Sequence, residues 1–451
     1  MERESLGSRL GFILISAGCA IGIGNVWRFP YLCGQYGGGA FVLVYLFFLV
    51  IMGLPAMCME FSIGRASQKS PVRMYHELEP KGSFWHIHGY FCLVGNYILM
   101  MFYTTVAGWM LQYFFQEISG RFIGLDPEGV EGVFNSGLQN PALQVGFMAV
   151  VVVLGFLVNM RGLQSGLERV TKVMMILLII IMMILAVNSL FLPGAGVGIR
   201  YLLVPDFKRM QEAGIWNVIV AAMNQSFFTL SIGIGSMAIF GSYIGKDQAL
   251  MGESVNVVLL DTLVAICSGL IIIPACFAYD VEPGAGPSLI FITLPNIFNN
   301  MPMGRVWGSL FFIFMSFAAF STVLAVFENI MAMCMDLFGW DRTKTGLINI
   351  VLLFILSLPC ALGFNVLSGI QPLGEGSTFL DLEDYVVSNF LLPLGSLVFV
   401  FFCTRKSGWG WENFRREADE GEGLKVRDWM RPYITWVLPV LIIIVFVMGV
   451  I

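Results

Sequence analysis

The chain has 451 residues, of which 57% are hydrophobic and 12% charged, and its formal net charge is −5. A soluble domain carries about twice this charged fraction, so the composition excludes an ordinary soluble protein and indicates an integral membrane protein built from helices. A transmembrane barrel would show alternating segments of roughly ten residues, and the sequence has none. The negative net charge and the lack of a basic stripe exclude nucleic acid as a partner.

Eleven apolar segments are long enough to cross a bilayer. Most Lys and Arg residues lie in the loops that fall on the same side of the membrane as the N-terminus. We therefore expect a multi-pass protein of the cell inner (plasma) membrane with a cytoplasmic N-terminus. Because the number of spans is odd, the C-terminus should lie outside. The predicted spans are 10–35, 39–64, 86–118, 142–159, 170–191, 215–242, 250–279, 305–336, 346–364, 381–403 and 432–451.

Two of these segments are interrupted by glycines, in the runs Gly22-Ile23-Gly24-Asn25 and Gly233-Ile234-Gly235-Ser236. An open backbone at membrane depth is costly unless its polar groups line a cavity. A matched pair of breaks, one in each half, predicts a transporter site between two inverted repeats. We expect the first repeat at 1–191 (helices 1–5), the second at 215–403 (helices 6–10, with an outer lid loop at 281–304), and helix 11 at 432–451.

Few residues offer other chemistry. The nine cysteines are scattered singly through apolar stretches without a CxxC pair, which argues against a metal, redox or disulfide framework. His76, His86 and His88 fall near one loop. We expect them to be solvated or interfacial, because we identify no carboxylate–histidine spacing beside them. With no phosphate-binding loop and no Ser–His–Asp pattern, we do not expect an enzyme.

The run from Ala20 to Pro30, AIGIGNVWRFP, resembles the signature of the neurotransmitter:sodium symporter family. Further similar runs are Glu60–Arg65 (EFSIGR), Asn224–Ser231 (NQSFFTLS) and Ile292–Pro295 (ITLP). The similarity covers essentially the whole chain and is greatest to the bacterial amino acid transporters with eleven helices. It implies a leucine-transporter-like fold, which is an all-α 5+5 inverted repeat with unwound helices 1 and 6 plus an eleventh helix.

On physical grounds, a half-helix that begins near Gly24 points free N–H groups at a carboxylate, and the carbonyls of the breaks suit a small cation. By resemblance, one or two Na⁺ ions would bind. The first sodium site would comprise Ala20, Asn25, Thr229 and Asp261. The second would comprise Gly18, Ile21, Ala318, Ser321 and Thr322. The implied substrate pocket is lined by Cys19, Ala20, Gly22, Gly24, Leu99, Tyr103, Phe228, Thr229, Ser231, Ile234, Phe320, Thr322 and Val326.

Two residues point to the transported solutes. A carboxylate within a span costs about 2.5–3.5 kcal/mol on insertion scales, so Asp261 should have a functional partner. Chloride-independent relatives resemble this chain in carrying a fixed acid there, although a direct or an indirect contact of Asp261 with sodium stays open. Gly22 stands where monoamine carriers have an aspartate. It leaves room for the carboxylate of an α-amino acid, and the apolar pocket favours a hydrophobic or aromatic side chain.

The resemblance also implies two gates. Arg28 and Asp384 would form the outer gate above Tyr103 and Phe228, and Arg3 with Asp336 would form the inner latch. From the residues themselves, we expect Glu60 to accept hydrogen bonds from amides freed in helix 6. Glu328 receives no predicted role.

The sequence therefore predicts a sodium-coupled secondary active symporter that imports a hydrophobic or aromatic α-amino acid by alternating access, independently of chloride. Two alternatives stay open, which are an amino acid sensor without net flux and a carrier of a compatible solute such as betaine. A betaine carrier should have an aromatic cage. The particular amino acid and the oligomeric state do not follow from the sequence.

Overall fold

The computed structural model describes residues 4–279 and 288–450, and within these ranges the chain is helical, with only two isolated β-bridges. Among these described residues, nine helices are long and apolar enough to cross a membrane, and a bent pair can count as a tenth. Those nine are Gly39–Ser67, Ile87–Ser119, Pro141–Met160, Leu163–Leu190, Leu250–Ala278, Gly304–Phe338, Arg342–Leu362, Phe379–Thr404 and Met430–Val450.

The bent pair corresponds to the first predicted span. The nine single helices correspond to nine of the other ten predicted spans. The sixth predicted span, 215–242, consists instead of two short helices, α12 (Ile215–Phe228) and α13 (Ser236–Gly241), which together lack a continuous apolar length. The reason is the long interruption between them, at 229–235. The prediction of breaks in helices 1 and 6 is thus confirmed, and the second break begins earlier than its glycines.

The spanning elements are α1 (Arg9–Ala20), η1 (Gly24–Arg28), α2 (Phe29–Gln35), α3 (Gly39–Phe48), η2 (Leu49–Gly53), α4 (Leu54–Ser67), α6 (Ile87–Ser119), α8 (Pro141–Met160), η3 (Leu163–Glu168), α9 (Arg169–Leu190), α12 (Ile215–Phe228), α13 (Ser236–Gly241), α14 (Leu250–Ala278), α16 (Gly304–Phe338), α17 (Arg342–Leu362), α18 (Phe379–Tyr385), η5 (Val386–Leu391), α19 (Leu392–Thr404), α21 (Met430–Pro432), η6 (Tyr433–Val437) and α22 (Leu438–Val450).

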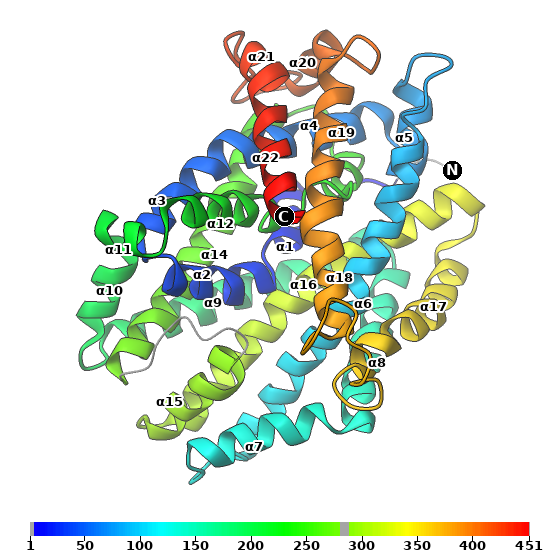
Figure 1. The fold of residues 1–451 in the computed structure, drawn as a ribbon. Coiled ribbons are helices and arrows are strands. Elements are labelled where there is room, and N and C mark those ends of the chain that lie inside the picture. The colour runs from blue at the N-terminus through cyan, green and yellow to red at the C-terminus, as the bar shows by residue number, and fades with distance from the viewer. Residues whose placement is uncertain (1–3, 280–287, 451) are drawn as a thin grey trace.

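Shorter elements lie at the two ends of the bundle: α5 (Pro71–Leu78), α7 (Pro127–Leu138), α10 (Ala195–Leu203), α11 (Phe207–Glu212), η4 (Leu289–Thr293), α15 (Leu294–Asn300) and α20 (Trp411–Ala418). Figure 1 shows α20 at one end and α7 and α15 at the other. The predicted lid loop falls partly outside the described residues. Its described part forms η4 and α15, and the ring of Phe291 packs there against Trp27, Trp109 and Tyr113.

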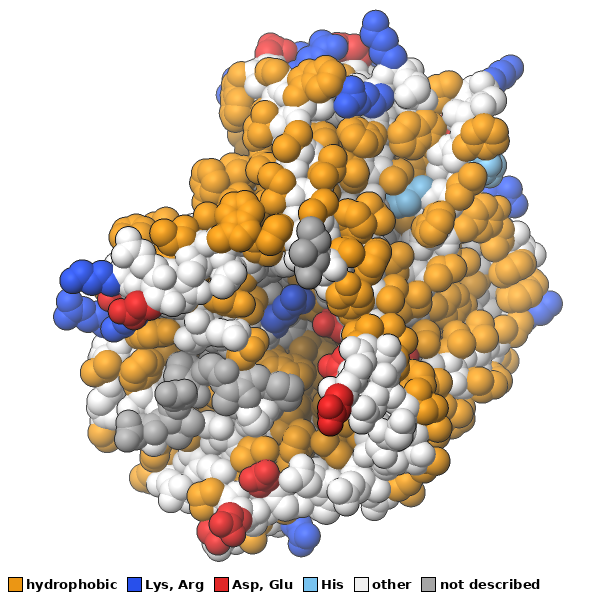
Figure 2. Space-filling view, in the orientation of Figure 1, with side chains coloured by type: hydrophobic (Ala, Val, Ile, Leu, Met, Phe, Trp, Pro, Cys, Tyr) orange, Lys and Arg blue, Asp and Glu red, His pale blue; other side chains and the backbone are white. Residues whose placement is uncertain are grey.

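The core is formed by α1, α6, α13 and α16, which pack around the two breaks. Figure 2 shows that apolar side chains cover much of one face, and that Lys, Arg, Asp and Glu lie mainly at its margins and around a hollow near its middle. A bilayer would contact such an apolar band, since its interior offers no partner for charged groups. The fold therefore places the open backbone of helices 1 and 6 in the protein interior, away from lipid.

Candidate substrate and ion site

The break in helix 1 separates two helical pieces that differ in direction by 57°. α1 ends at Ala20, Ile21 is extended (ψ 99°), and helical geometry resumes at Gly24. The amide of Gly22 donates to Oδ1 of Asn25 over 3.2 Å, and the amide of Ile23 donates to the hydroxyl of Tyr103 over 3.0 Å. Buried side chains therefore satisfy the freed amides, as burial of backbone polar groups requires.

The break in helix 6 has a left-handed backbone at Ser231 (φ +51°), Gly233 (φ +102°) and Gly235 (φ +76°). Glycine adopts this region without a Cβ clash, whereas serine does so at a cost. A carboxylate oxygen of Glu60 accepts the amide of Gly233 over 2.5 Å. This contact confirms the predicted role of Glu60 and explains why a carboxylate is tolerated at a fully buried position of α4.

A small cavity of about 20 Å³ lies between the two breaks. Val387 and Leu392 line it although they were not predicted, because no motif in the sequence connects η5 and α19 with the breaks. Thr229, Phe320 and Val326 were predicted to line the pocket but are not among its lining residues. Ten predicted residues do line it: Cys19, Ala20, Gly22, Gly24, Leu99, Tyr103, Phe228, Ser231, Ile234 and Thr322.

The predicted first sodium site is a compact buried cluster. The side-chain amide of Asn25 donates to Oδ1 of Asp261 over 2.8 Å and to the hydroxyl of Thr229 over 3.0 Å. That hydroxyl in turn donates to Oδ2 of Asp261 over 3.0 Å, and all three side chains are fully buried. The oxygens of Thr229 and Asp261 are hard ligands that suit a small cation, so these residues fit Na⁺. Asn25 directs its amide nitrogen to them and its Oδ1 to the Gly22 amide.

Oxygens also converge at the predicted second sodium site. The hydroxyl of Thr322 donates to the carbonyls of Gly18 (3.1 Å) and Ile21 (3.2 Å). The hydroxyl of Ser321 donates to the carbonyl of Ala318 over 2.9 Å and lies 3.5 Å from that of Ile21. The five predicted residues therefore meet between α1 and α16, and these oxygens also fit a small cation.

A second cavity, of about 250 Å³, lies on the other side of Tyr103 and Phe228, which line both spaces. Arg28 and Asp384 both line this second cavity, yet no ion pair joins them within the described residues. The guanidinium of Arg28 instead lies 4.4 Å from the ring centroid of Phe228. A cation over an aromatic face is attracted by the ring quadrupole, so Arg28 contacts the aromatic residue that covers the central cavity.

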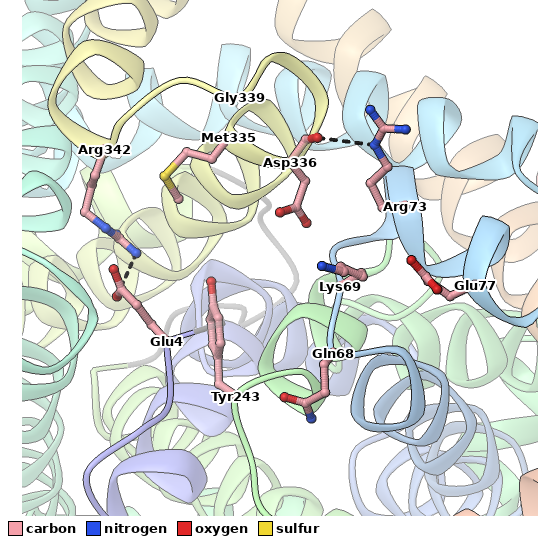
Figure 3. Close-up of a pocket in the computed structure, with 10 residues that line it drawn as sticks. All are labelled: Glu4, Gln68, Lys69, Arg73, Glu77, Tyr243, Met335, Asp336, Gly339 and Arg342. Atoms are coloured by element: carbon pink, nitrogen blue, oxygen red, sulfur yellow. Dashed lines mark hydrogen bonds and ion pairs between the residues drawn. The ribbon is translucent and has the colours of Figure 1, made fainter. Parts of the chain in front are cut away.

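A cavity of about 450 Å³ opens at the end of the bundle that carries α5 (Figure 3). Asp336, which lines it, accepts the amide of Ser70 over 2.8 Å, and its carbonyl accepts Nε of Arg73 over 3.2 Å. The predicted latch partner Arg3 lies outside the described residues. The predicted latch itself therefore remains a prediction.

A buried ionic network beside this cavity was missed by sequence reasoning. Both carboxylate oxygens of Glu328 accept from Arg342 (2.7 and 3.0 Å), and one also accepts the hydroxyl of Tyr243 over 2.8 Å. Arg342 reaches Glu4 as well, over 3.0 Å. Glu328 is therefore paired with a cation. The sequence signalled only that Glu328 is an acid within a span. Its partner Arg342 begins the next helix, so no local pattern connects the two residues.

Comparisons with known proteins agree with this geometry. The profile described as "Sodium:neurotransmitter symporter family" matches residues 3–123 and 129–451. The chain belongs to this family. Members of it are sodium-dependent transporters and not enzymes, and the chain is accordingly a sodium-dependent, multi-pass membrane transporter with the leucine-transporter-like fold.

Three relatives illustrate the similarity. A sodium-dependent transporter of Bacillus subtilis (strain 168), YhdH, is 35% identical over 88% of this chain and 87% of its own length. A sodium- and chloride-dependent taurine transporter of Canis lupus familiaris is 26% identical over 99% of this chain and 78% of its own. A solved structure described as "MhsT in complex with L-phenylalanine" has a TM-score of 0.88 and 36% identity, covering 99% of this chain and all of its own.

Proposed function

We propose that this sodium symporter imports a hydrophobic or aromatic α-amino acid by alternating access, without a requirement for chloride. The observation that carries the proposal is the central cavity between the two breaks. Its lining combines Gly22, Gly24 and the Tyr103 hydroxyl with the apolar side chains of Leu99, Ile234 and Val387. A zwitterion with an apolar side chain matches this combination.

Recognition of the carboxylate would use groups that now bond to one another. The hydroxyl of Tyr103 accepts the Ile23 amide, and both groups can turn to a carboxylate placed at Gly22. Helix N-termini favour anions at such positions. The related transporter whose structure contains L-phenylalanine supports an aromatic or large apolar substrate, as does the modest size of Ile234 in the pocket wall.

The coupling ions would occupy the two oxygen clusters described above. Asn25, Thr229 and Asp261 would hold one Na⁺ beside the substrate, and the carbonyl of Ala20 would complete this shell. Gly18, Ile21, Ala318, Ser321 and Thr322 would hold a second Na⁺. We infer chloride independence from Asp261, because its fixed carboxylate can balance the sodium charge that a bound anion balances elsewhere.

Alternating access would follow from the arrangement of the three cavities. The central one is near the size of a single water molecule, so an amino acid can enter only if Phe228 and Tyr103 move. Arg28 and Asp384 would close above them, and Arg3 with Asp336 would close below. We propose a cytoplasmic N-terminus and an external C-terminus in the inner membrane, with repeats at 1–191 and 215–403 and helix 11 at 432–451.

The decisive experiment uses the purified chain in liposomes with an imposed Na⁺ gradient and a panel of labelled amino acids. We expect uptake of Phe, Leu or a similar substrate. This uptake should require an inward-directed Na⁺ gradient and should persist when gluconate replaces chloride. Binding without net uptake would favour a sensor, and uptake of betaine in preference to amino acids would favour a compatible-solute carrier. Loss of uptake in gluconate would contradict the role of Asp261.

A further inference from the structure

Three potential metal ligands meet at the end of the bundle that carries α5. His76 lies in the last turn of α5, Glu79 directly follows that helix, and His86 precedes α6. Oε1 of Glu79 lies 2.7 Å from Nδ1 of His86 and 3.6 Å from Nδ1 of His76. One ligand atom from each residue lies within 4.8 Å of the others, and the two imidazole rings stack with centroids 4.5 Å apart.

The carboxylate of Glu79 is held in place by groups around it. Its other oxygen, Oε2, accepts the hydroxyl of Ser83 over 2.8 Å and the amide of His86 over 3.2 Å. Partial burial acts to raise the pKa of Glu79, but these hydrogen bonds and His86 outweigh it and hold the pKa below its ordinary value. Within the described residues, the side chains that approach its Oε1 are the two histidines.

Two imidazoles and one carboxylate form a ligand set that zinc uses, with the fourth tetrahedral position open to water. Zinc-to-ligand distances of about 2.1 Å place tetrahedral ligand atoms roughly 3.4 Å apart. His86 and Glu79 already lie within this reach, and His76 needs only a small rotation. The His76 side chain is 42% exposed, which leaves room for that rotation. Hydrogen bonds to a ligating carboxylate are a regular feature of such sites.

We propose that His76, Glu79 and His86 form a binding site for a divalent transition metal of the zinc class. This proposal replaces our expectation that these histidines are merely solvated. The spacing of His76 and Glu79, three residues apart around a helix end, was a signal in the sequence. The contribution of His86 was not, because the loop between α5 and α6 decides where it lies. His88 is excluded, since it is buried and its Nδ1 lies 2.7 Å from the Tyr75 hydroxyl.

A metal at this site would fasten the end of α5 to the start of α6. α5 also carries Arg73 and Glu77, which line the 450 Å³ cavity (Figure 3), and Arg73 contacts the carbonyl of Asp336. The site therefore lies on the helix that forms one wall of this cavity. Because transport requires the cavity walls to move, a fastened α5 should slow the transport cycle.

Binding can be tested with the full-length chain, tag-free and stripped with a chelator, by calorimetric titration with ZnCl₂. The chain has three histidines in total, and its nine cysteines are all buried, so other zinc ligands are scarce. We expect one Zn²⁺ per chain with half-saturation below about 10 μM, and no comparable binding of Mg²⁺, which prefers oxygen ligands. The absence of saturable 1:1 zinc binding would overturn the proposal.

Variants identify the ligands. His76→Ala, Glu79→Gln and His86→Ala should each weaken zinc binding by about tenfold or more. Glu77→Gln is the matched control, because Glu77 is exposed on the same helix and carries the same charge. His76→Cys should keep a ligand and shift preference toward Cd²⁺, since thiolates favour soft metals. This gain cannot arise from misfolding. Zinc binding that survives all three ligand variants would overturn the assignment.

The effect of zinc on transport can be measured as Na⁺-driven uptake into liposomes with ZnCl₂ added on either side. Zinc should slow uptake by the parent chain several-fold and leave uptake by His76→Ala unchanged. His76 is outside the proposed substrate and sodium sites, so this variant reports the metal site alone. Zinc binding with equal uptake rates in both proteins would overturn the proposed restraint on α5.

Discussion

At the residue scale, the absence of a side chain at Gly22 shapes the central site. A Cβ at this position would lie 2.3 Å from the Tyr103 hydroxyl and 2.6 Å from the Thr322 hydroxyl. These two hydroxyls belong to different proposed functions, carboxylate recognition and sodium binding. The contact between them at Gly22 indicates how substrate and ion would influence each other through one residue.

Gly22→Ala should therefore weaken amino acid binding, because Tyr103 and Thr322 must both move to make room. Overpacking of this kind costs about 1–3 kcal/mol, or roughly a tenfold to hundredfold loss of affinity. Scintillation proximity binding with labelled substrate measures the change. Gly146→Ala is the control, because a Cβ there meets nothing within 4 Å. Equal affinities for the two variants would contradict the proposed site.

Asp261 allows a separate test of chloride independence. Asp261→Asn removes the fixed negative charge while it keeps the size of the side chain and a hydrogen-bond acceptor for Asn25. We expect uptake in gluconate buffer to fall about tenfold, and chloride to restore part of it, because an added anion can balance the charge of sodium. If the variant takes up substrate as fast as the parent chain in gluconate, and chloride does not change its rate, the proposal that Asp261 balances the sodium charge is wrong.

At the element scale, the break in helix 6 depends on α4. Glu60 on α4 accepts the Gly233 amide, and the carbonyl of Leu392 on α19 lies so close that a Cβ on Gly233 would approach it to 2.2 Å. α13 packs along α4 on the far side of the break. The open backbone is therefore held between two neighbouring helices, and its conformation depends on both of them.

Glu60→Leu should destabilise the fold by about 1–3 kcal/mol, since the buried amide of Gly233 would lose its acceptor. Glu60→Gln retains a carbonyl oxygen at nearly the same place and should cost less. Reversible unfolding by SDS in mixed micelles compares the two variants. Equal losses for Glu60→Gln and Glu60→Leu would show that the charge, and not the acceptor, matters.

The contact of the segment after α13 with the segment after α20 depends on pH. The hydrogen bond from Lys246 lowers the pKa of Glu420, and the same bond raises the pKa of Lys246. The contribution of Glu420 is present above its ordinary pKa and is lost as the pH falls toward the lowered value. The contribution of Lys246 is present below its ordinary pKa and is lost as the pH rises toward the raised value.

The stability difference between the parent chain and Lys246→Gln should accordingly be greatest between about pH 5 and pH 10. It should shrink on either side of this range. Both groups are exposed, so the difference should be small and should decrease with added salt. Melting temperatures of the detergent-solubilised proteins across pH measure it. A difference that grows below pH 4 would contradict the assignment.

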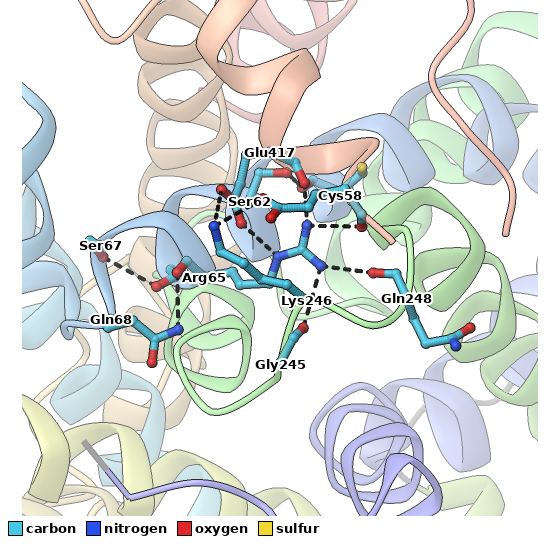
Figure 4. A network of polar contacts seen from close by, with 11 residues as sticks. Cys58, Ser62, Arg65, Ser67, Gln68, Gly245, Lys246, Gln248 and Glu417 are labelled. Atoms are coloured by element: carbon cyan, nitrogen blue, oxygen red, sulfur yellow. Dashed lines mark hydrogen bonds and ion pairs between the residues drawn. The ribbon is translucent and has the colours of Figure 1, made fainter. Parts of the chain in front are cut away.

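At the scale of the whole molecule, one buried arginine joins segments that are hundreds of residues apart (Figure 4). Arg65, at the end of α4, is fully buried, and its Nε donates to the Glu417 carboxylate over 2.7 Å. It also donates to the carbonyls of Glu417 and Gln248. α20 is thereby fastened to α4 and to the loop before α14, at the end of the bundle where the 450 Å³ cavity opens.

Arg65→Met should destabilise the chain by up to roughly 3–5 kcal/mol. The Glu417 carboxylate would lose its buried cation and keep only the more exposed Lys246, whose Nζ lies 3.5 Å from Oε2. Glu417→Gln should cost less, since the main-chain carbonyls continue to accept from Arg65. The double variant should recover part of the loss, and a double-mutant cycle in SDS unfolding gives the coupling. Additive effects of the two substitutions would contradict a direct interaction.

The sequence by itself determined the class of the protein, most of the spans and the two breaks. Apolar length and the cost of an open backbone in lipid are properties of local segments, so Gly22 and Gly233 indicated which two spans would be interrupted. Tertiary structure decided which distant groups meet. Val387 in the pocket, Arg342 beside Glu328, and His86 beside Glu79 depend on how helices and loops pack. Local sequence carries no record of such packing, because each contact arises only when separate segments are brought together.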